Sequence, residues 1–141
     1  MNESDLGLLS SELRCALRAV ETRLEAALEP LGLSLAKFGV LSRLAAAGEP
    51  LPLGTLAEQS ACVRSNITQL VDRLEADKLV VRAPDPHDRR SIRAELTEVG
   101  RARHSAAATV LHDAERTVFS GLPPEQRDVF LGMLRSLQAG R

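Results

Sequence analysis

The sequence predicts a mainly α-helical chain that carries one small β-hairpin. Three observations predict this fold class: apolar residues recur every three or four positions over most of the chain, two helical patterns in the middle are separated by a short break, and the period changes to that of strands only once. The expected order is four helices, a hairpin and two further helices. With 141 residues, 44% of them hydrophobic and 26% charged, the chain is long enough for one domain, and a disordered chain is excluded.

The first predicted helix is long and has an apolar stripe that approaches a heptad repeat. The stripe consists of residues spaced by three or four positions: Leu6, Leu9, Leu13, Leu17, Val20, Leu24, Ala27 and Leu31. A small domain can cover only part of this stripe, so we expect the rest to pair with another chain or with distant helices. Helical packing within one domain is the alternative. Pro30 and Gly32 are expected to end the helix, and Ser34 to cap the next one, which Gly48 stops.

The middle of the chain has the pattern of a helix-turn-helix unit. Residues 53–60 fit a short helix, residues 61 and 62 a break, and residues 63–77 a second, longer helix with one apolar face. At 100° per residue, the opposite face gathers polar side chains: Ser65, Thr68, Gln69 and Asp72 at its centre, Arg64 on one flank, Asn66 and Arg73 on the other. Any helical hairpin with one solvated face would show a similar pattern.

The β-hairpin is predicted from two short runs, 79–82 and 92–96, that are β-branched or alternate in polarity. Residues 83–91 between them contain two prolines and turn-forming aspartates. Thr97 is expected to cap the following helix, which repeats small apolar residues at every fourth position: Ala102, Ala106, Val110, Ala114 and Val118. A last helix is expected to start at the two prolines before Glu125.

Composition and charge narrow the classes of protein. The chain has 18 basic and 19 acidic residues, so its net charge is −1, and taken alone this argues against nucleic-acid binding. Its two cysteines are too few for a disulfide scaffold, which fits a reducing compartment. There is no signal-peptide pattern, and no apolar run approaches the roughly 18 residues that a membrane span needs. We therefore expect a cytoplasmic protein without a membrane partner.

The charge is unevenly distributed along the chain. Residues 1–61 contain five bases and eight acids, net −3; residues 62–103 contain nine bases and seven acids, net +2; residues 104–141 contain four of each. Four arginines fall on the predicted hairpin: Arg82, Arg89, Arg90 and Arg93. Arginine suits phosphate oxygens and narrow minor grooves. The alternative is a solvated hairpin in which Asp85 and Asp88 pair with these arginines.

Five short motifs follow one another between residues 56 and 100: Leu56-Ala57, Ile67–Glu75, Leu79–Arg82, Asp85–Ser91 and Leu96–Gly100. In this order they resemble the MarR family of bacterial winged-helix transcription regulators. The resemblance implies one domain over residues 1–141. Within it, residues 35–100 would form a winged helix-turn-helix DNA-binding lobe, and residues 1–34 and 101–141 a helical dimerisation region.

The resemblance also implies roles for single residues. The helix over 63–77 would be the recognition helix in the major groove, with these side chains nearest to base edges or phosphates: Arg64, Ser65, Asn66, Thr68 and Gln69, and Arg73 nearer to the DNA backbone. In the hairpin, Asp88 would orient Arg90 toward the minor groove, and Arg89 would contact a phosphate. For Thr68 and Gln69 a merely solvated helix face is the alternative.

One position departs from the family pattern. Lys78 stands where the family usually has a glycine after the recognition helix. A glycine there adopts a left-handed backbone, and a lysine is expected to cost about 1 kcal/mol. The departure puts the geometry of the helix end in question and leaves the fold as expected.

The function implied by the resemblance is a sequence-specific transcriptional regulator, commonly a repressor, that binds a pseudo-palindromic double-stranded operator as a homodimer. Release by a small anionic aromatic ligand in a cleft between dimerisation helices and DNA-binding lobe is the usual regulation. Arg14 and Arg18 could face such a ligand or pair with Glu21 or Glu25. A winged-helix protein-interaction module without DNA binding is a second hypothesis.

No cofactor, metal site or enzymatic activity is expected, because the three histidines are scattered and no catalytic or phosphate-binding motif occurs. Cys62 stands near the start of the recognition helix, where the helix dipole favours a thiolate, so a redox-sensing regulator is a third hypothesis. The alternative for Cys15 and Cys62 is a small buried residue. The phenylalanines lie within apolar helical patterns and are expected in the core: Phe38, Phe119 and Phe130.

Overall fold

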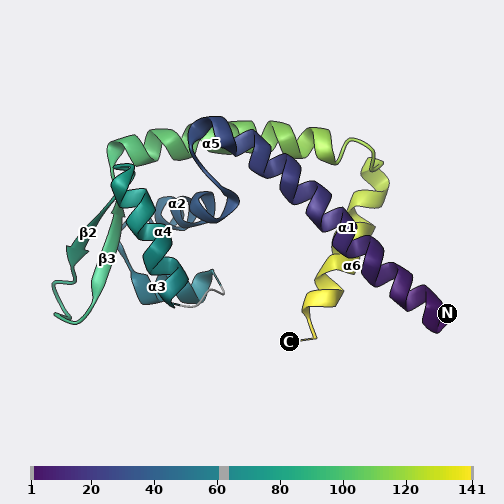
Figure 1. Cartoon of the computed structure of the whole chain (residues 1–141), viewed down its shortest axis with the longest axis horizontal. Coiled ribbons are helices and arrows are strands. Elements are labelled where there is room, and N and C mark those ends of the chain that lie inside the picture. Colours follow the sequence, from purple (N-terminus) through teal and green to yellow (C-terminus); the bar gives the residue numbers. More distant parts are fainter. Residues whose placement is uncertain (1, 61–63, 141) are drawn as a thin grey trace.

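The computed structural model describes residues 2–60 and 64–140. The elements follow the predicted order: α1 (Glu3–Leu28), η1 (Glu29–Leu31), α2 (Leu35–Ala47), β1 (Leu51–Pro52), α3 (Leu53–Gln59), α4 (Arg64–Ala76), β2 (Val80–Pro84), β3 (Ile92–Leu96), α5 (Glu98–Val118) and α6 (Pro124–Gln138). The prediction of a mainly helical chain with a small β-hairpin is confirmed. A lobe made of α2, α3, α4 and the strands lies at one end, the N-terminus lies at the other, and the C-terminus lies between them (Figure 1).

The helices begin and end at the residues that the sequence marks. The Ser34 hydroxyl accepts a hydrogen bond from the Lys37 N–H (3.1 Å), and the Thr97 hydroxyl accepts one from the Gly100 N–H (2.9 Å), so both predicted caps are confirmed. Gly48 ends α2 with φ 66°, a left-handed conformation that a glycine adopts without steric cost. Proline stands in the first turn of α6, as expected.

The sheet has three antiparallel strands in the order β1-β3-β2. In the hairpin, Val80 pairs with Leu96 and Arg82 pairs with Ala94. The third strand, β1, is only two residues long and was not expected, because two residues are too few to show a period. It adds Pro52 at the edge of the sheet, where a missing N–H leaves no ladder bond unmade.

The hydrophobic core lies in the lobe. The largest fully buried side chains come from α2, α3, α4, the strand β2 and the end of α1: Leu28, Val40, Leu41, Leu56, Ile67, Val71, Leu74, Leu79 and Val80. Of the described residues of α1, Leu28 alone is buried, and α6 contributes none. The lobe therefore has its own core, whereas the long helices leave it with most of their apolar surface uncovered.

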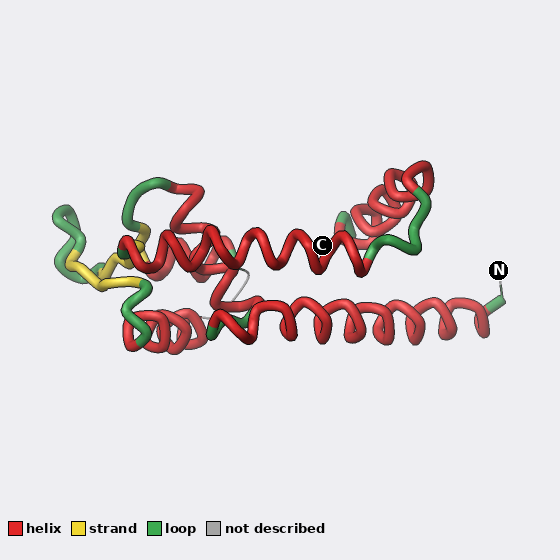
Figure 2. Tube along the Cα trace, turned by 90° about the horizontal axis from the view of Figure 1, so that it is seen from above, coloured by secondary structure: helices red, strands yellow, loops and turns green. Residues whose placement is uncertain are grey.

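Helix α5 joins the lobe to the outer helices. It runs beside α1 in the opposite direction (Figure 2). Arg103 donates a hydrogen bond to the Leu31 carbonyl (2.7 Å), and His104 bonds to the Ser42 hydroxyl (3.1 Å) while its ring stacks on Phe38, with ring centroids 5.3 Å apart. These contacts attach α5 to η1 and α2.

The buried face of α5 differs from the stripe seen in the sequence. Gly100, Ala107 and Leu111 are buried, whereas Ala102 and Ala106 are exposed. A step of four residues advances the helix by about 400°, so an every-fourth pattern drifts around the helix by about 40° per step and cannot stay on one face. The buried residues are spaced by seven and then by four positions, a combination that keeps them on one side of the helix.

Three expectations of burial are wrong in the single chain. Phe119 and Phe130 are 37% and 39% exposed, and Cys15 is exposed. All three lie on the parts of α1, α5 and α6 that leave the lobe, where the chain supplies no second layer. Phe38, by contrast, packs partly against the core. Cys62 lies outside the described residues.

The charged side chains of α1 are also placed differently. Among the described residues, Arg14 and Arg18 make no ion pair with Glu21 or Glu25. The Glu25 carboxylate instead accepts hydrogen bonds from the Leu35 N–H at 3.1 and 3.2 Å, which helps to close the start of α2. Within the part that the structure describes, no helix is both long and apolar enough to cross a membrane.

Candidate nucleic-acid interface

Helices α3 and α4 form the predicted helix-turn-helix unit, and burial determines which side of α4 faces outward. Ile67, Val71 and Leu74 are fully buried and anchor α4 on the core. Three predicted site residues of α4 are exposed, and a fourth is half-buried: Asn66, Gln69 and Arg73, and Thr68. The predicted polar outer face is therefore present over this part of the helix. The side chains of Arg64 and Ser65, and the whole of Cys62, lie outside the described part of the chain.

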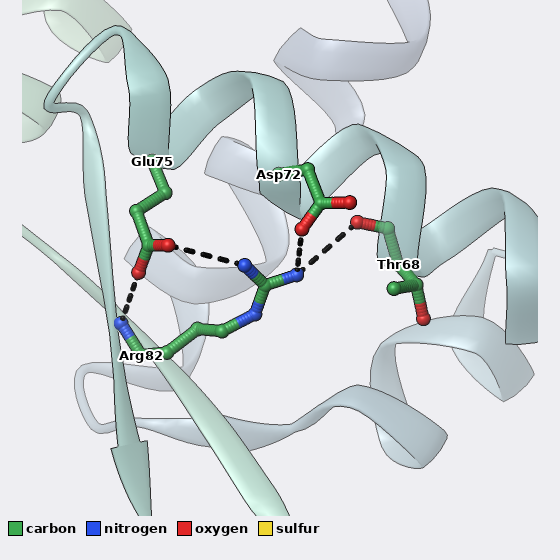
Figure 3. A network of polar contacts seen from close by, with 4 residues as sticks. All are labelled: Thr68, Asp72, Glu75 and Arg82. Atoms are coloured by element: carbon green, nitrogen blue, oxygen red, sulfur yellow. Dashed lines mark hydrogen bonds and ion pairs between the residues drawn. The ribbon is translucent and has the colours of Figure 1, made fainter.

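Arg82 links strand β2 to helix α4 through four hydrogen bonds (Figure 3). Its guanidinium donates to the Asp72 carboxylate (2.5 Å), the Glu75 carboxylate (3.1 Å) and the Thr68 backbone carbonyl (3.3 Å). The Arg82 backbone N–H donates to the second oxygen of Glu75 (3.1 Å). We call these four residues the Arg82 clamp. It joins the hairpin to the outer face of α4.

The alternative for the hairpin, in which Asp85 and Asp88 pair with its arginines, is not found among the described residues. The ion pairs among the described residues are those of Arg82 with Asp72 and Glu75, and one between Lys37 and Asp77. Arg93 points elsewhere and donates to the Pro50 carbonyl at 3.4 Å. The spacing of charges along the hairpin gave no sign of this, because the acids that pair with Arg82 belong to the preceding helix.

The two aspartates of the hairpin shape its tip through backbone hydrogen bonds. Asp85 accepts from the His87 N–H (2.8 Å), and Asp88 accepts from the Arg90 N–H (2.9 Å). Such short-range bonds from an aspartate to the backbone two residues later stabilise turns. Asp88 thus holds the backbone of Arg90, while the side chains of Arg89 and Arg90 are exposed.

At the base of the hairpin, Leu79 after α4, Leu96 of β3 and Gly100 of α5 lie close together. Lys78 has φ 63°, and the N–H groups of Lys78 and Leu79 bond to the carbonyls of Glu75 and Leu74 (both 2.9 Å), as in a Schellman motif. The geometry that the sequence left in question is thus the left-handed one, adopted by Lys78 in place of a glycine. A Cβ on Gly100 would lie 2.0 Å from the Leu79 carbonyl oxygen, so only glycine fits there.

Basic side chains lie on the outer face of α4, just after its end and on the hairpin. Four of them are exposed and, within the described residues, make no ion pair: Arg73, Lys78, Arg89 and Arg90. Arginine and lysine side chains in this state are available to phosphate oxygens. The described residues contain no group of three or more histidine, cysteine, aspartate or glutamate side chains that could hold a metal ion.

Comparisons with known proteins agree with this arrangement. The family model for the MarR family matches residues 31–91, which span α2, α3, α4 and the hairpin up to its tip. A transcriptional repressor of the helix-turn-helix type from Mycobacterium tuberculosis is 30% identical over 136 residues, which cover 96% of this chain and 95% of the relative.

Two solved structures are similar over nearly the whole chain. A MarR-family transcriptional regulator from Rhodococcus sp. RHA1 is 29% identical, with a TM-score of 0.80 over 97% of this chain and 94% of that one. BpsR from Bordetella bronchiseptica, whose DNA binding is regulated by 6-hydroxynicotinic acid, is 26% identical, with a TM-score of 0.84 over 94% of each chain. The chain therefore belongs to the MarR family of winged-helix transcriptional regulators, which are not enzymes.

Proposed function

We propose that the protein is a repressor that binds a pseudo-palindromic operator as a homodimer. Helix α4 of each copy enters the major groove, with the predicted side chains of its outer face toward base edges and phosphates: Arg64, Ser65, Asn66, Thr68, Gln69 and Arg73. The hairpin places Arg90 in the flanking minor groove and Arg89 on a phosphate, and Asp88 holds the turn that carries them. The observation that carries the proposal is that the outer face of α4 and the hairpin tip are both exposed and both carry arginines that make no ion pair within the described residues.

Uncovered apolar surface on the outer helices supports the homodimer. On α1, Leu6, Leu9, Leu13 and Leu17 are between 42% and 59% exposed. Together α1 and α6 line an apolar groove of about 520 Å³: Leu6, Leu9, Ser10, Leu13, Phe130, Met133, Leu134 and Leu137. Exposed apolar residues that lie together on two neighbouring helices mark an interaction surface. A second copy of the chain is the proposed occupant, since it offers the same apolar residues in return.

We further propose that a small anionic aromatic ligand releases the operator by changing the spacing of the two recognition helices. The regulation of BpsR by 6-hydroxynicotinic acid supports a ligand of this class. The ligand would act at the contacts between lobe and outer helices, where Arg103 bonds to the Leu31 carbonyl and His104 to Ser42. A hollow of about 600 Å³ beside α1 suits an anion poorly, because it is lined by Glu21, Glu25 and Glu29 and by a single arginine.

Selection from a randomised duplex library tests the proposal. We expect a palindromic site whose affinity falls steeply with salt. The Arg90→Ala variant should bind this site more weakly and with a salt slope lower by about 1. Arg116→Ala, which removes an exposed arginine at the far end of α5, is the matched control. If the wild type binds no duplex at low salt, and Arg90→Ala behaves identically, the chain is a protein-interaction module instead.

A further inference from the structure

The hairpin is attached to the lobe by strand pairing and buried apolar residues and, in addition, by polar bonds to α4. Strands β2 and β3 already pair over five residues each, and Leu79, Val80 and Ala94 are fully buried beneath them. The Arg82 clamp adds bonds between the sheet and the outer, polar side of α4. Its acceptors, Thr68, Asp72 and Glu75, are spaced by four and three positions and so lie on one side of the helix.

We propose that Arg82 is a positioning residue for DNA recognition. It holds the hairpin in a fixed relation to the recognition helix and neutralises Asp72 on the face that meets the DNA. This inference rests on the proposed function, because it assigns a role within the same interface. Arg82 itself touches no DNA in this scheme.

Exposure separates Arg82 from the arginines proposed to contact DNA. Its side chain is only 21% exposed, whereas those of its partners Asp72 and Glu75 are 58% and 43% exposed. Its guanidinium donates to three acceptors on α4. A phosphate would have to break these charge-assisted bonds before it could bind, so Arg82 is a poor phosphate ligand.

The geometry of the clamp requires arginine. A guanidinium carries five N–H donors in a rigid plane, so one side chain can reach two carboxylates and a carbonyl together. Glu75 completes the link, since one carboxylate oxygen accepts from the Arg82 side chain and the other from its backbone N–H. The strand itself is thereby tied to α4, and a lysine could not make the same set of bonds.

Charge gives the clamp its second effect. On a helical projection Asp72 lies beside Gln69, close to the centre of the outer face. An unpaired carboxylate there would repel the phosphates that Arg73 and the hairpin arginines attract. Because Asp72 is bonded to Arg82, this repulsion is reduced. The Asp72 carboxylate still serves as the acceptor that orients the Arg82 guanidinium.

The sharpest test compares a substitution of Arg82 that keeps its charge with one that removes it. We expect Arg82→Lys and Arg82→Ala each to weaken binding of the selected operator by about tenfold or more, the change that 1.4 kcal/mol produces. Arg82→Lys should leave the affinity for an unrelated duplex and the salt slope unchanged, since the net charge is kept. Arg93→Ala is the matched control, because it removes one arginine of the same sheet that bonds to Pro50 and not to α4. Its ratio of operator to unrelated-duplex affinity should stay that of the wild type.

A second substitution tests the neutralisation of Asp72. In the Arg82→Ala background, Asp72→Asn should recover part of the lost affinity, whereas in the wild-type background it should give no such gain. If Arg82 contacts phosphate directly, Arg82→Lys will retain wild-type affinity, Arg82→Ala will lower the salt slope by about 1, and Asp72→Asn will give the same change in both backgrounds. That pattern would overturn the proposal.

Hydrogen exchange without DNA separates failure of this inference from failure of the proposed function. Arg82→Lys and Arg82→Ala should speed exchange of the amides at residues 80–83 and 92–96, and Arg93→Ala should do so less. If the wild type binds no duplex while exchange responds as expected, the operator proposal fails and the clamp stands as a structural link. If exchange in both Arg82 variants equals that of the wild type, the hairpin is held without Arg82 and the inference is wrong.

Discussion

Lys78 has the left-handed backbone that glycine usually supplies at the end of a helix, with φ 63°. Two hydrogen bonds of 2.9 Å, from the N–H groups of Lys78 and Leu79, impose this conformation because they satisfy the last carbonyls of α4. The side chain is exposed and takes part in no ion pair within the described residues. The lysine therefore bears the steric cost of the position without a contact in the single chain that offsets it.

We expect Lys78→Gly to raise the free energy of unfolding by up to about 1 kcal/mol, because it removes the Cβ from a left-handed residue. Urea denaturation measures the change. Lys78→Ala is the control, since it removes the same charge and keeps the Cβ. An equal gain in both variants would show that charge, and not backbone strain, sets the cost.

Gly100 is the counterpart of Lys78, a residue whose missing side chain the fold needs. A Cβ there would lie 2.0 Å from the Leu79 carbonyl oxygen and 3.2 Å from the Leu96 side chain. Gly100→Ala should therefore lower the free energy of unfolding by about 1–3 kcal/mol, as overpacking does. Val99→Ala, at the exposed neighbouring position, should change it by no more than about 0.5 kcal/mol. Thermal unfolding of the two variants compares them, and an unchanged midpoint in Gly100→Ala would contradict the close approach.

At the scale of elements, the hairpin is organised by its backbone bonds and by the helix beside it. Asp88 reaches the Arg90 N–H at 2.9 Å and makes no ion pair among the described residues. The role expected for Asp88, orienting Arg90, thus has a physical basis in the turn and not in charge pairing. Contact of either residue with DNA stays a prediction.

The turn gives a prediction that separates shape from charge. Asp88→Ala removes the acceptor for the Arg90 N–H, so the hairpin tip loosens and operator affinity falls by about five- to tenfold, as for loss of one hydrogen bond. Asp88→Asn keeps an acceptor oxygen and should bind nearly as the wild type or slightly more tightly. Titration of the operator by fluorescence anisotropy measures both. A loss in Asp88→Asn as large as in Asp88→Ala would show that the negative charge matters.

The whole molecule has a lobe with its own core and outer helices whose apolar faces the chain leaves open. Phe119 and Phe130, expected in the core, lie in the outer part at 37% and 39% exposure. The apolar stripe of α1 is exposed as well. Its length in the sequence indicated that another chain or distant helices would cover it. The proposed homodimer would bury these residues together and would hold two copies of α4 at one spacing.

Disrupting the open face tests the homodimer. Leu13→Glu puts a carboxylate into the groove between α1 and α6 and should convert the protein to a monomer, because an unpaired charge is costly in an apolar interface. Operator affinity should then fall about a hundredfold, since two half-sites no longer bind one linked pair. Val99→Glu is the control. It puts the same charge on another exposed apolar residue, at the start of α5, and should stay dimeric. Light scattering after size exclusion gives the mass, and a wild-type mass in Leu13→Glu would rule out this interface.

The sequence by itself determined the order of elements, the caps at Ser34 and Thr97, and the outer face of α4. These are local properties: a period of 3.6 or 2 residues and a capping hydroxyl act within a few positions of the chain. The geometry at Lys78 was left open by the sequence, and the structure gives it as left-handed. Most of the described site residues that the sequence predicts are exposed.

The tertiary structure alone decided which partners distant residues find. Arg82 bonds to α4 and not to the aspartates of its own hairpin, the buried face of α5 is that of Ala107 and Leu111, and β1 pairs with β3. Hydrogen bonds and packing act over a few ångströms of space whatever the separation along the chain, so no pattern of spacing encodes them. The sequence places several arginines close to α4 along the chain. The fold shows that Arg82 bonds to this helix, whereas Arg89 and Arg90 make no ion pair within the described residues.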